Sequence, residues 1–142
     1  MEYCPKSLKE EMIEKGQFTE VELKKILRDI CVGLSYLHRN DIVHLDIKPG
    51  KINKIHKNLK FLENILISKT KKYKLGDMGQ SALAKLSFEE IEEGDARYLA
   101  PELLNSEEYS EKPELTKADV FSLGITLFEL ATGNILPNFQ FI

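Results

Sequence analysis

Residues 43–49 read V-H-L-D-I-K-P, and this stretch decides how the rest of the chain is interpreted. It follows a segment with helical spacing and precedes the apolar run I-L-I, which begins directly after Asn64. Asp46 can accept a proton, Lys48 can neutralise negative charge, and the amide oxygen of Asn64 can bind a metal ion. Alone the stretch is a weak signal, because His44 could be a core histidine and Asp46 could be a turn residue.

Two further motifs follow in a fixed order and strengthen this signal. L-G-D-M-G lies at residues 75–79, and A-P-E lies at residues 100–102. Together with the stretch around Asp46 they resemble the signature motifs of eukaryotic protein kinases. The resemblance implies that Asp46 accepts or orients the proton of a substrate hydroxyl. It also implies that Lys48 neutralises charge on the phosphoryl group that is transferred.

The same resemblance assigns the metal and nucleotide contacts. Asn64 and Asp77 would bind Mg²⁺ that bridges the phosphates of ATP, so the implied cofactors are ATP and Mg²⁺. Glu2 and Cys4 belong to the segment E-Y-C, which resembles the hinge whose backbone binds adenine; an ordinary edge strand is the alternative. Asp119 resembles the kinase aspartate that anchors the catalytic loop.

The composition is that of an ordinary globular protein. The chain has 142 residues, 42% apolar and 30% charged, and its 20 basic and 23 acidic side chains give a net charge of −3. Because these charges are interspersed, we expect no nucleic-acid partner and no anionic membrane partner. Cys4 and Cys31 lack metal or disulfide spacing. No secretory or membrane-spanning pattern is present, so we expect an intracellular protein of the nucleus or cytoplasm.

Helix and turn signals along the chain predict an α+β fold. Helices are expected over residues 8–15, 19–38 and 117–133, and two short strands over residues 65–68 and 73–75. Ser7 and the pair Thr19 and Glu22 are capping signals, and Gly16 and Gly133 are stop signals. The first residues read as a strand end that breaks at Pro5. The last helix is apolar on most sides and is expected to be largely buried.

Residues 50–62 depart from the kinase pattern, in which a single residue separates the proline from the asparagine. One interpretation is a loop insertion, whose apolar residues would form a short amphipathic helix. The other, which we favour, is an unspliced intron. The codons of Gly50 and Lys51 can contain GTAAA, and those from Phe61 to Glu63 can contain TTTTTAG. Excision between them would leave the family pattern P-E-N in frame.

A more specific resemblance comes from the segment before A-P-E. E-E-G-D-A-R-Y-L-A-P-E-L-L at residues 92–104, together with the motifs above and A-D-V-F-S-L-G-I-T-L at residues 118–127, resembles the Wee and Myt kinases. Asp95 stands where most kinases have threonine, and our hypothesis is that it pairs with Lys48. Leu45 replaces the arginine that usually binds a phosphate on the activation segment, so we expect no dependence on such a phosphate.

The resemblance implies that residues 1–142 are a partial protein kinase domain, from the hinge to about helix F and truncated at both ends. The chain has no G-x-G-x-x-G, and the small lobe is missing, so the isolated chain is expected to be inactive. The implied function is inhibition of a cyclin-dependent kinase, the protein substrate, with a serine, threonine or tyrosine acceptor left open. The alternatives are a catalytically inactive binding module and an incomplete gene-model fragment.

Overall fold

The computed structural model describes residues 2–50, 64–87, 95–104 and 114–134. The predicted insertion at 50–62 lies outside the described residues except for Gly50, so its interpretation stays a prediction. The acidic residues at 89–93 also lie outside them.

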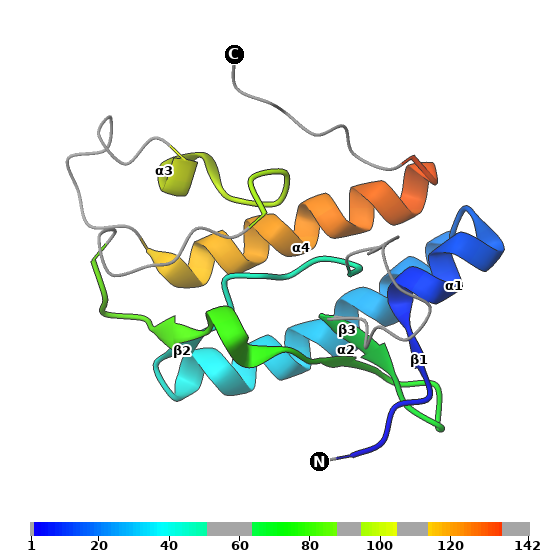
Figure 1. Cartoon of the computed structure of the whole chain (residues 1–142), viewed down its shortest axis with the longest axis horizontal. Coiled ribbons are helices and arrows are strands. Elements are labelled where there is room, and N and C mark those ends of the chain that lie inside the picture. The colour runs from blue at the N-terminus through cyan, green and yellow to red at the C-terminus, as the bar shows by residue number, and fades with distance from the viewer. Residues whose placement is uncertain (1, 51–63, 88–94, 105–113, 135–142) are drawn as a thin grey trace, which may run out of the picture.

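Four α-helices, one 3₁₀ helix and five short strands make up the described part of the chain (Figure 1). The helices are α1 (Leu8–Lys15), α2 (Glu20–Arg39), η1 (Met78–Gln80), α3 (Pro101–Leu104) and α4 (Leu115–Thr132). The strands are β1 (Lys6–Ser7), β2 (Ile42–Val43), β3 (Ile65–Ile67), β4 (Tyr73–Leu75) and β5 (Ala82–Leu83). None of these helices has both the length and the apolar composition needed to cross a bilayer.

Capping residues set the ends of the first two helices, as the sequence predicts. Ser7 accepts a hydrogen bond from the backbone N–H of Glu10, whose side chain returns to the Ser7 backbone, and α1 stops at Gly16. Thr19 and Glu22 form the same reciprocal capping box at the start of α2. These contacts satisfy N–H groups that have no partner within the helix.

The strands form two small antiparallel sheets. In the first, β3 lies between β1 and β4, with Ile65 opposite Leu75 and Lys6 opposite Ile67. The second pairs β2 with β5, which lies far along the chain. The predicted hairpin over β3 and β4 is confirmed. The predicted early strand differs, because β1 begins after Pro5 rather than ending at it.

The hydrophobic core lies where α2 packs against α4 and the first sheet. Its largest fully buried side chains are Leu8, Ile26, Ile30, Ile47, Ile65 and Leu130. The segment after β2 runs between α4 and α2 in the view of Figure 1. The Thr126 hydroxyl of α4 donates to the carbonyl oxygen of Ile47 at 3.4 Å. Ile47 thus joins the segment 44–50 to the core, and α4 contacts this segment directly.

The helix α4 is less buried than the sequence predicts. It begins two residues earlier than expected, at Leu115, and ends at Thr132 with Gly133 in the left-handed conformation. Among the described residues of this helix, Val120 is 61% exposed and Phe128 is 59% exposed. The pattern of apolar residues on most sides was therefore a poor guide to burial here, since one side of the helix packs on α2 and the other does not.

The capping box of α2 predicts an acid-dependent loss of stability. Hydrogen bonds to Glu22 from the Lys15 ammonium, the Thr19 backbone and the Thr19 hydroxyl lower the pKa of Glu22 to about 2. This pKa is depressed in the folded state, so ionised Glu22 stabilises the protein. Its contribution to the free energy of unfolding is complete above about pH 4.5 and disappears as the pH falls through 2. We expect Glu22→Gln to reduce the slope of unfolding free energy against pH in this window.

Urea denaturation between pH 2 and pH 6 measures that slope. Glu20→Gln is the matched control, since the Glu20 side chain lies in the same helical turn and is 80% exposed. Equal slopes for Glu22→Gln and Glu20→Gln would contradict the prediction.

Candidate active site

The carboxylate of Asp119, on α4, fixes the start of the segment 44–50. Its two oxygens accept hydrogen bonds from the backbone N–H groups of His44, at 2.9 Å, and of Leu45, at 2.8 Å. The Nε2 atom of His38, near the end of α2, lies 2.8 Å from the same carboxylate. Asp119 is fully buried, so these bonds replace its contacts with water. The anchoring expected from the sequence is present.

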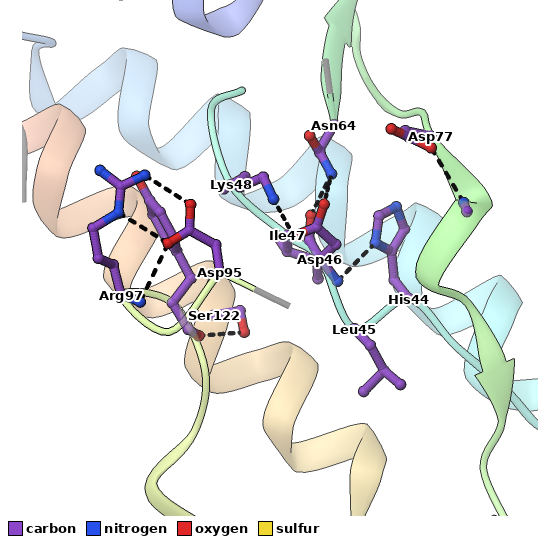
Figure 2. Close-up of polar contacts among 12 residues, drawn as sticks. His44, Leu45, Asp46, Ile47, Lys48, Asn64, Asp77, Asp95, Arg97 and Ser122 are labelled. Carbon is purple, nitrogen blue, oxygen red and sulfur yellow. Dashed lines mark hydrogen bonds and ion pairs between the residues drawn. The ribbon is translucent and has the colours of Figure 1, made fainter. Parts of the chain in front are cut away.

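Leu45 is held in a strained conformation by this anchor. Its φ is +61°, a left-handed conformation that costs a residue with a side chain roughly 1–2 kcal/mol. The strain persists because the surrounding contacts over-determine the backbone there. Its side chain points away from Asp46 (Figure 2) and packs in a second apolar cluster with Val43 and Leu115. An apolar contact therefore occupies the position where the resemblance expects arginine.

Asp46, Lys48 and Asn64 meet in one polar cluster (Figure 2). The Lys48 ammonium donates to one oxygen of the Asp46 carboxylate. The Asn64 amide donates to the other oxygen at 2.6 Å and to the Asp46 backbone carbonyl at 2.7 Å. The Lys48 side chain is only 3% exposed, whereas that of Asp46 is 12% exposed. The structure thus brings together three of the predicted site residues.

Two hydrogen bonds to Gly76 bring the loop of Asp77 next to this cluster (Figure 2). The N–H of Gly76 donates to the carbonyl oxygen of Asn64 at 2.9 Å, and Nε2 of His44 lies 2.9 Å from the carbonyl oxygen of Gly76. Asp77 itself has φ +47°, and its carboxylate accepts from the N–H of Gly79 at 3.2 Å. His44 therefore ties the loop of Asp46 to the loop of Asp77, which is a structural role.

The side-chain oxygens of Asn64 and Asp77 have the donor chemistry that suits a magnesium ion. Asn64 uses its amide nitrogen for both bonds to Asp46, so its side-chain oxygen is left for a ligand. Asp77 uses one carboxylate oxygen for Gly79. Amide and carboxylate oxygens are hard donors of the type that Mg²⁺ prefers, and Mg²⁺ commonly takes only one or two protein ligands beside phosphate and water. Asn64 and Asp77 are the residues that would hold it.

The chain matches the family model described as the protein kinase domain over residues 1–140. The chain belongs to the protein kinase family. Among curated proteins it is 36% identical to a Wee1-like protein kinase of Drosophila melanogaster and 38% identical to Wee1-like protein kinase 2-A of Xenopus laevis. It is 35% identical to Wee1-like protein kinase 2 of Homo sapiens.

These three alignments cover 96% of this kinase chain and 25 to 26% of the relatives, so the chain spans about a quarter of their length. The predicted resemblance to Wee-like kinases is confirmed, and so is the α+β kinase fold.

The residues predicted to form the kinase hinge precede β1, and Glu2 contacts a side chain of the first sheet. The Glu2 carboxylate pairs with the Lys74 ammonium of β4, and Lys69 Nζ lies 5.5 Å from the centre of the Tyr3 ring. Cys4 is partly exposed, and Glu2–Cys4 are not part of a strand. Asn64 and Asp77 flank the hairpin of β3 and β4. Their role in binding adenine stays a prediction.

The hypothesis that Asp95 pairs with Lys48 is wrong for this structure. Arg97 donates to Asp95 instead, from Nε at 2.9 Å and from Nη2 at 2.7 Å (Figure 2). The planar guanidinium of Arg97 can donate two hydrogen bonds to one carboxylate. The Lys48 ammonium instead donates to Asp46. Burial raises the pKa of Asp95, but Arg97 and the nearby Lys48 outweigh this effect and lower it.

Arg97 is therefore a residue that the sequence analysis missed. The sequence does place Arg97 two residues after Asp95, but this proximity alone does not show which of the two nearby cations pairs with the carboxylate.

Proposed function

We propose that the protein containing this chain is a Wee- or Myt-like protein kinase. In this proposal it transfers the γ-phosphate of ATP to a hydroxyl of a cyclin-dependent kinase and thereby inhibits it. The observation that carries the proposal is the cluster in which the Asp46 carboxylate contacts both Lys48 and Asn64, with Asp77 beside it. We further propose an intracellular site of action in the nucleus or cytoplasm.

Each residue of the cluster has one task in this mechanism. Asp46 orients the acceptor hydroxyl and takes its proton as the hydroxyl oxygen attacks. Lys48, already within reach of Asp46, neutralises charge on the phosphoryl group that is transferred. Asn64 and Asp77 would hold magnesium, which supplies charge neutralisation of the phosphates when it is bound. The hydrogen bond from the Asn64 side-chain amide keeps the Asp46 carboxylate in a fixed position during the reaction.

A transfer assay with γ-labelled ATP tests the proposal on the full-length protein. The substrate is a cyclin-dependent kinase made inactive by mutation, so that all label comes from the protein under test. We expect magnesium-dependent label that disappears when the residues with hydroxyl groups in the ATP-binding loop of this substrate are replaced, serine or threonine by alanine and tyrosine by phenylalanine. Replacing each acceptor alone identifies which hydroxyl is used.

Two results would contradict this proposal in different ways. Stable association with the cyclin-dependent kinase without label would favour a catalytically inactive binding module. Label that persists after all these hydroxyl residues are replaced would exclude the proposed substrate site while keeping the kinase activity.

A further inference from the structure

The turn between β3 and β4 concentrates positive charge on the surface. Four of the six residues at 69–74 are lysines, in a chain whose net charge is −3. Three of these lysines, Lys69, Lys71 and Lys72, are exposed and are called the basic turn below. None of the three forms an ion pair with a carboxylate of the described residues. Like charges so close together repel one another, and a negatively charged partner would relieve this repulsion.

The carboxylates that contact β4 are bound to other groups. Glu2 pairs with the Lys74 ammonium. Glu11 accepts a hydrogen bond from the Tyr73 hydroxyl at 3.3 Å, and Asp29 accepts one from the Tyr73 backbone N–H at 3.2 Å. Over the described residues, the charge of the basic turn is therefore left without an internal counter-charge.

Hydrogen bonds hold the backbone of the turn in one conformation. The N–H of Lys71 donates to the carbonyl oxygen of Ser68 at 2.9 Å, and the N–H of Ser68 donates to the carbonyl oxygen of Lys72 at 2.9 Å. The Ser68 hydroxyl accepts from the N–H of Lys72 at 3.1 Å and lies 3.0 Å from the Thr70 hydroxyl oxygen. The lysines thus start from fixed backbone positions, which lowers the entropy that is lost when a partner binds.

The backbone of Lys71 is strained. Its φ is +57°, a left-handed conformation that turns usually give to glycine or asparagine. Lys71 is exposed, so no packing in the core requires its side chain. Strain of this kind at a surface position points to a use for the side chain itself.

Two aromatic rings orient cations at this surface without neutralising them. Lys69 Nζ lies 5.5 Å from the centre of the Tyr3 ring, and Lys25 Nζ of α2 lies 5.8 Å from the centre of the Tyr73 ring. The face of an aromatic ring attracts an ammonium group but carries no net charge. Both ammonium groups therefore keep their charge for a ligand, and Lys25 extends the positive surface from the hairpin onto α2.

The arrangement fits a row of carboxylates. Residues 68–74 contain no arginine, the side chain that binds one phosphate group with two parallel hydrogen bonds. Lysines are separate point charges, so each can bind a different carboxylate. A long polyanion such as nucleic acid would also meet the Glu2 side chain, which is 55% exposed, whereas a short acidic segment need not.

We propose that the basic turn, together with Lys25, is a docking site for an acidic segment of a protein partner. The turn lies at one end of the β3 and β4 hairpin, and Asn64 and Asp77 flank the other end. The docking site is therefore distinct from the candidate active site. The inference goes beyond the proposed function and does not depend on phosphate transfer.

Fluorescence anisotropy of a labelled peptide that contains a run of glutamates tests the inference on the full-length protein. The same peptide with glutamines in place of the glutamates is the control for charge. The triple variant Lys69→Gln, Lys71→Gln and Lys72→Gln removes the charge of the basic turn without shortening the side chains to alanine.

The matched control variant removes the same amount of charge elsewhere. It carries Arg39→Gln, Lys85→Gln and Lys117→Gln, all at exposed positions outside the hairpin. The triple variant of the basic turn is expected to bind the glutamate peptide roughly 3- to 100-fold more weakly than the wild type, since each exposed ion pair contributes a factor of about 1.5 to 5. The control variant should stay within about twofold of the wild type.

Two results of this comparison would overturn the inference. An equal loss in both triple variants would mean that only the net charge of the protein matters. A wild type that binds the glutamate and glutamine peptides equally would mean that no acidic segment is recognised.

The variant Lys71→Gly tests the argument from strain separately. Glycine adopts a positive φ freely, so the Tm of this variant is expected to equal or exceed that of the wild type. Its affinity for the glutamate peptide should nevertheless fall about 1.5- to 5-fold. A variant that melts at the higher temperature and binds the peptide as tightly as the wild type would refute a binding role for the Lys71 side chain.

The same assay separates an acidic protein segment from other polyanions. Vesicles of phosphatidylcholine with phosphatidylserine and a single-stranded DNA oligonucleotide are added as competitors. We expect the peptide to bind more tightly than either. If the vesicles or the DNA bind more tightly, and only the variant of the basic turn loses this binding, the assignment to a protein segment is wrong.

Discussion

Replacing Asp46 with asparagine is expected to lower the rate of phosphate transfer by about 10²- to 10⁴-fold, the usual contribution of a general base. Asparagine has nearly the same shape, so it can keep a contact with Lys48 and with the Asn64 amide. It cannot take the proton of the acceptor hydroxyl. We therefore expect the loss in kcat, with little change in KM for ATP, since Asp46 contacts the acceptor and not the nucleotide in the proposed mechanism.

The measurement is steady-state kinetics of the full-length protein with magnesium and ATP. Asp41→Asn is a matched control, because it makes the same chemical change close to the loop. Asp41 is exposed and has φ +56°, a left-handed conformation that asparagine also adopts readily. A variant at Asp46 that keeps more than about a tenth of the wild-type kcat would exclude the role of general base.

Elements with local signals were predictable from the sequence. Thr19 with Glu22 starts α2, and Gly16 ends α1, because caps act through neighbours a few residues apart. The hairpin of β3 and β4 has a short connection, so its two strands find each other locally. In contrast, the pairing of β2 (Ile42–Val43) with β5 (Ala82–Leu83) was not predicted. Two-residue strands carry no alternation, and their pairing depends on tertiary contacts.

The candidate site also combines contacts that the sequence could predict with one that it could not. Asp46, Asn64 and Asp77 could be predicted to lie together because each belongs to a recognisable motif, and the hydrogen bonds through Gly76 do bring their loops together. The partner of Asp95 could not be derived from motif order. Two cations are near it, and the choice of Arg97 depends on side-chain geometry and on the prior contact of Lys48 with Asp46.

The second large effect concerns Asp119. Asp119→Ala is expected to lower the free energy of unfolding by about 3–5 kcal/mol. The backbone N–H groups of His44 and Leu45 would both lose their acceptor inside the protein, and each unsatisfied buried donor costs about 1–3 kcal/mol. The left-handed backbone of Leu45 would also lose the contacts that maintain it.

Urea denaturation of the wild type and the variants measures this difference. Asp119→Asn keeps one acceptor oxygen, so its free energy of unfolding should lie between those of the wild type and the alanine variant. Glu114→Ala, at the exposed start of the same helix, should change stability by less than about 0.5 kcal/mol. A loss below about 1 kcal/mol for Asp119→Ala would mean that other contacts suffice to hold the segment 44–50. In that case Asp119 would not be the residue that places Asp46, and the positions of Lys48 and Asn64 around it would depend on other contacts, such as the one from Thr126 to Ile47.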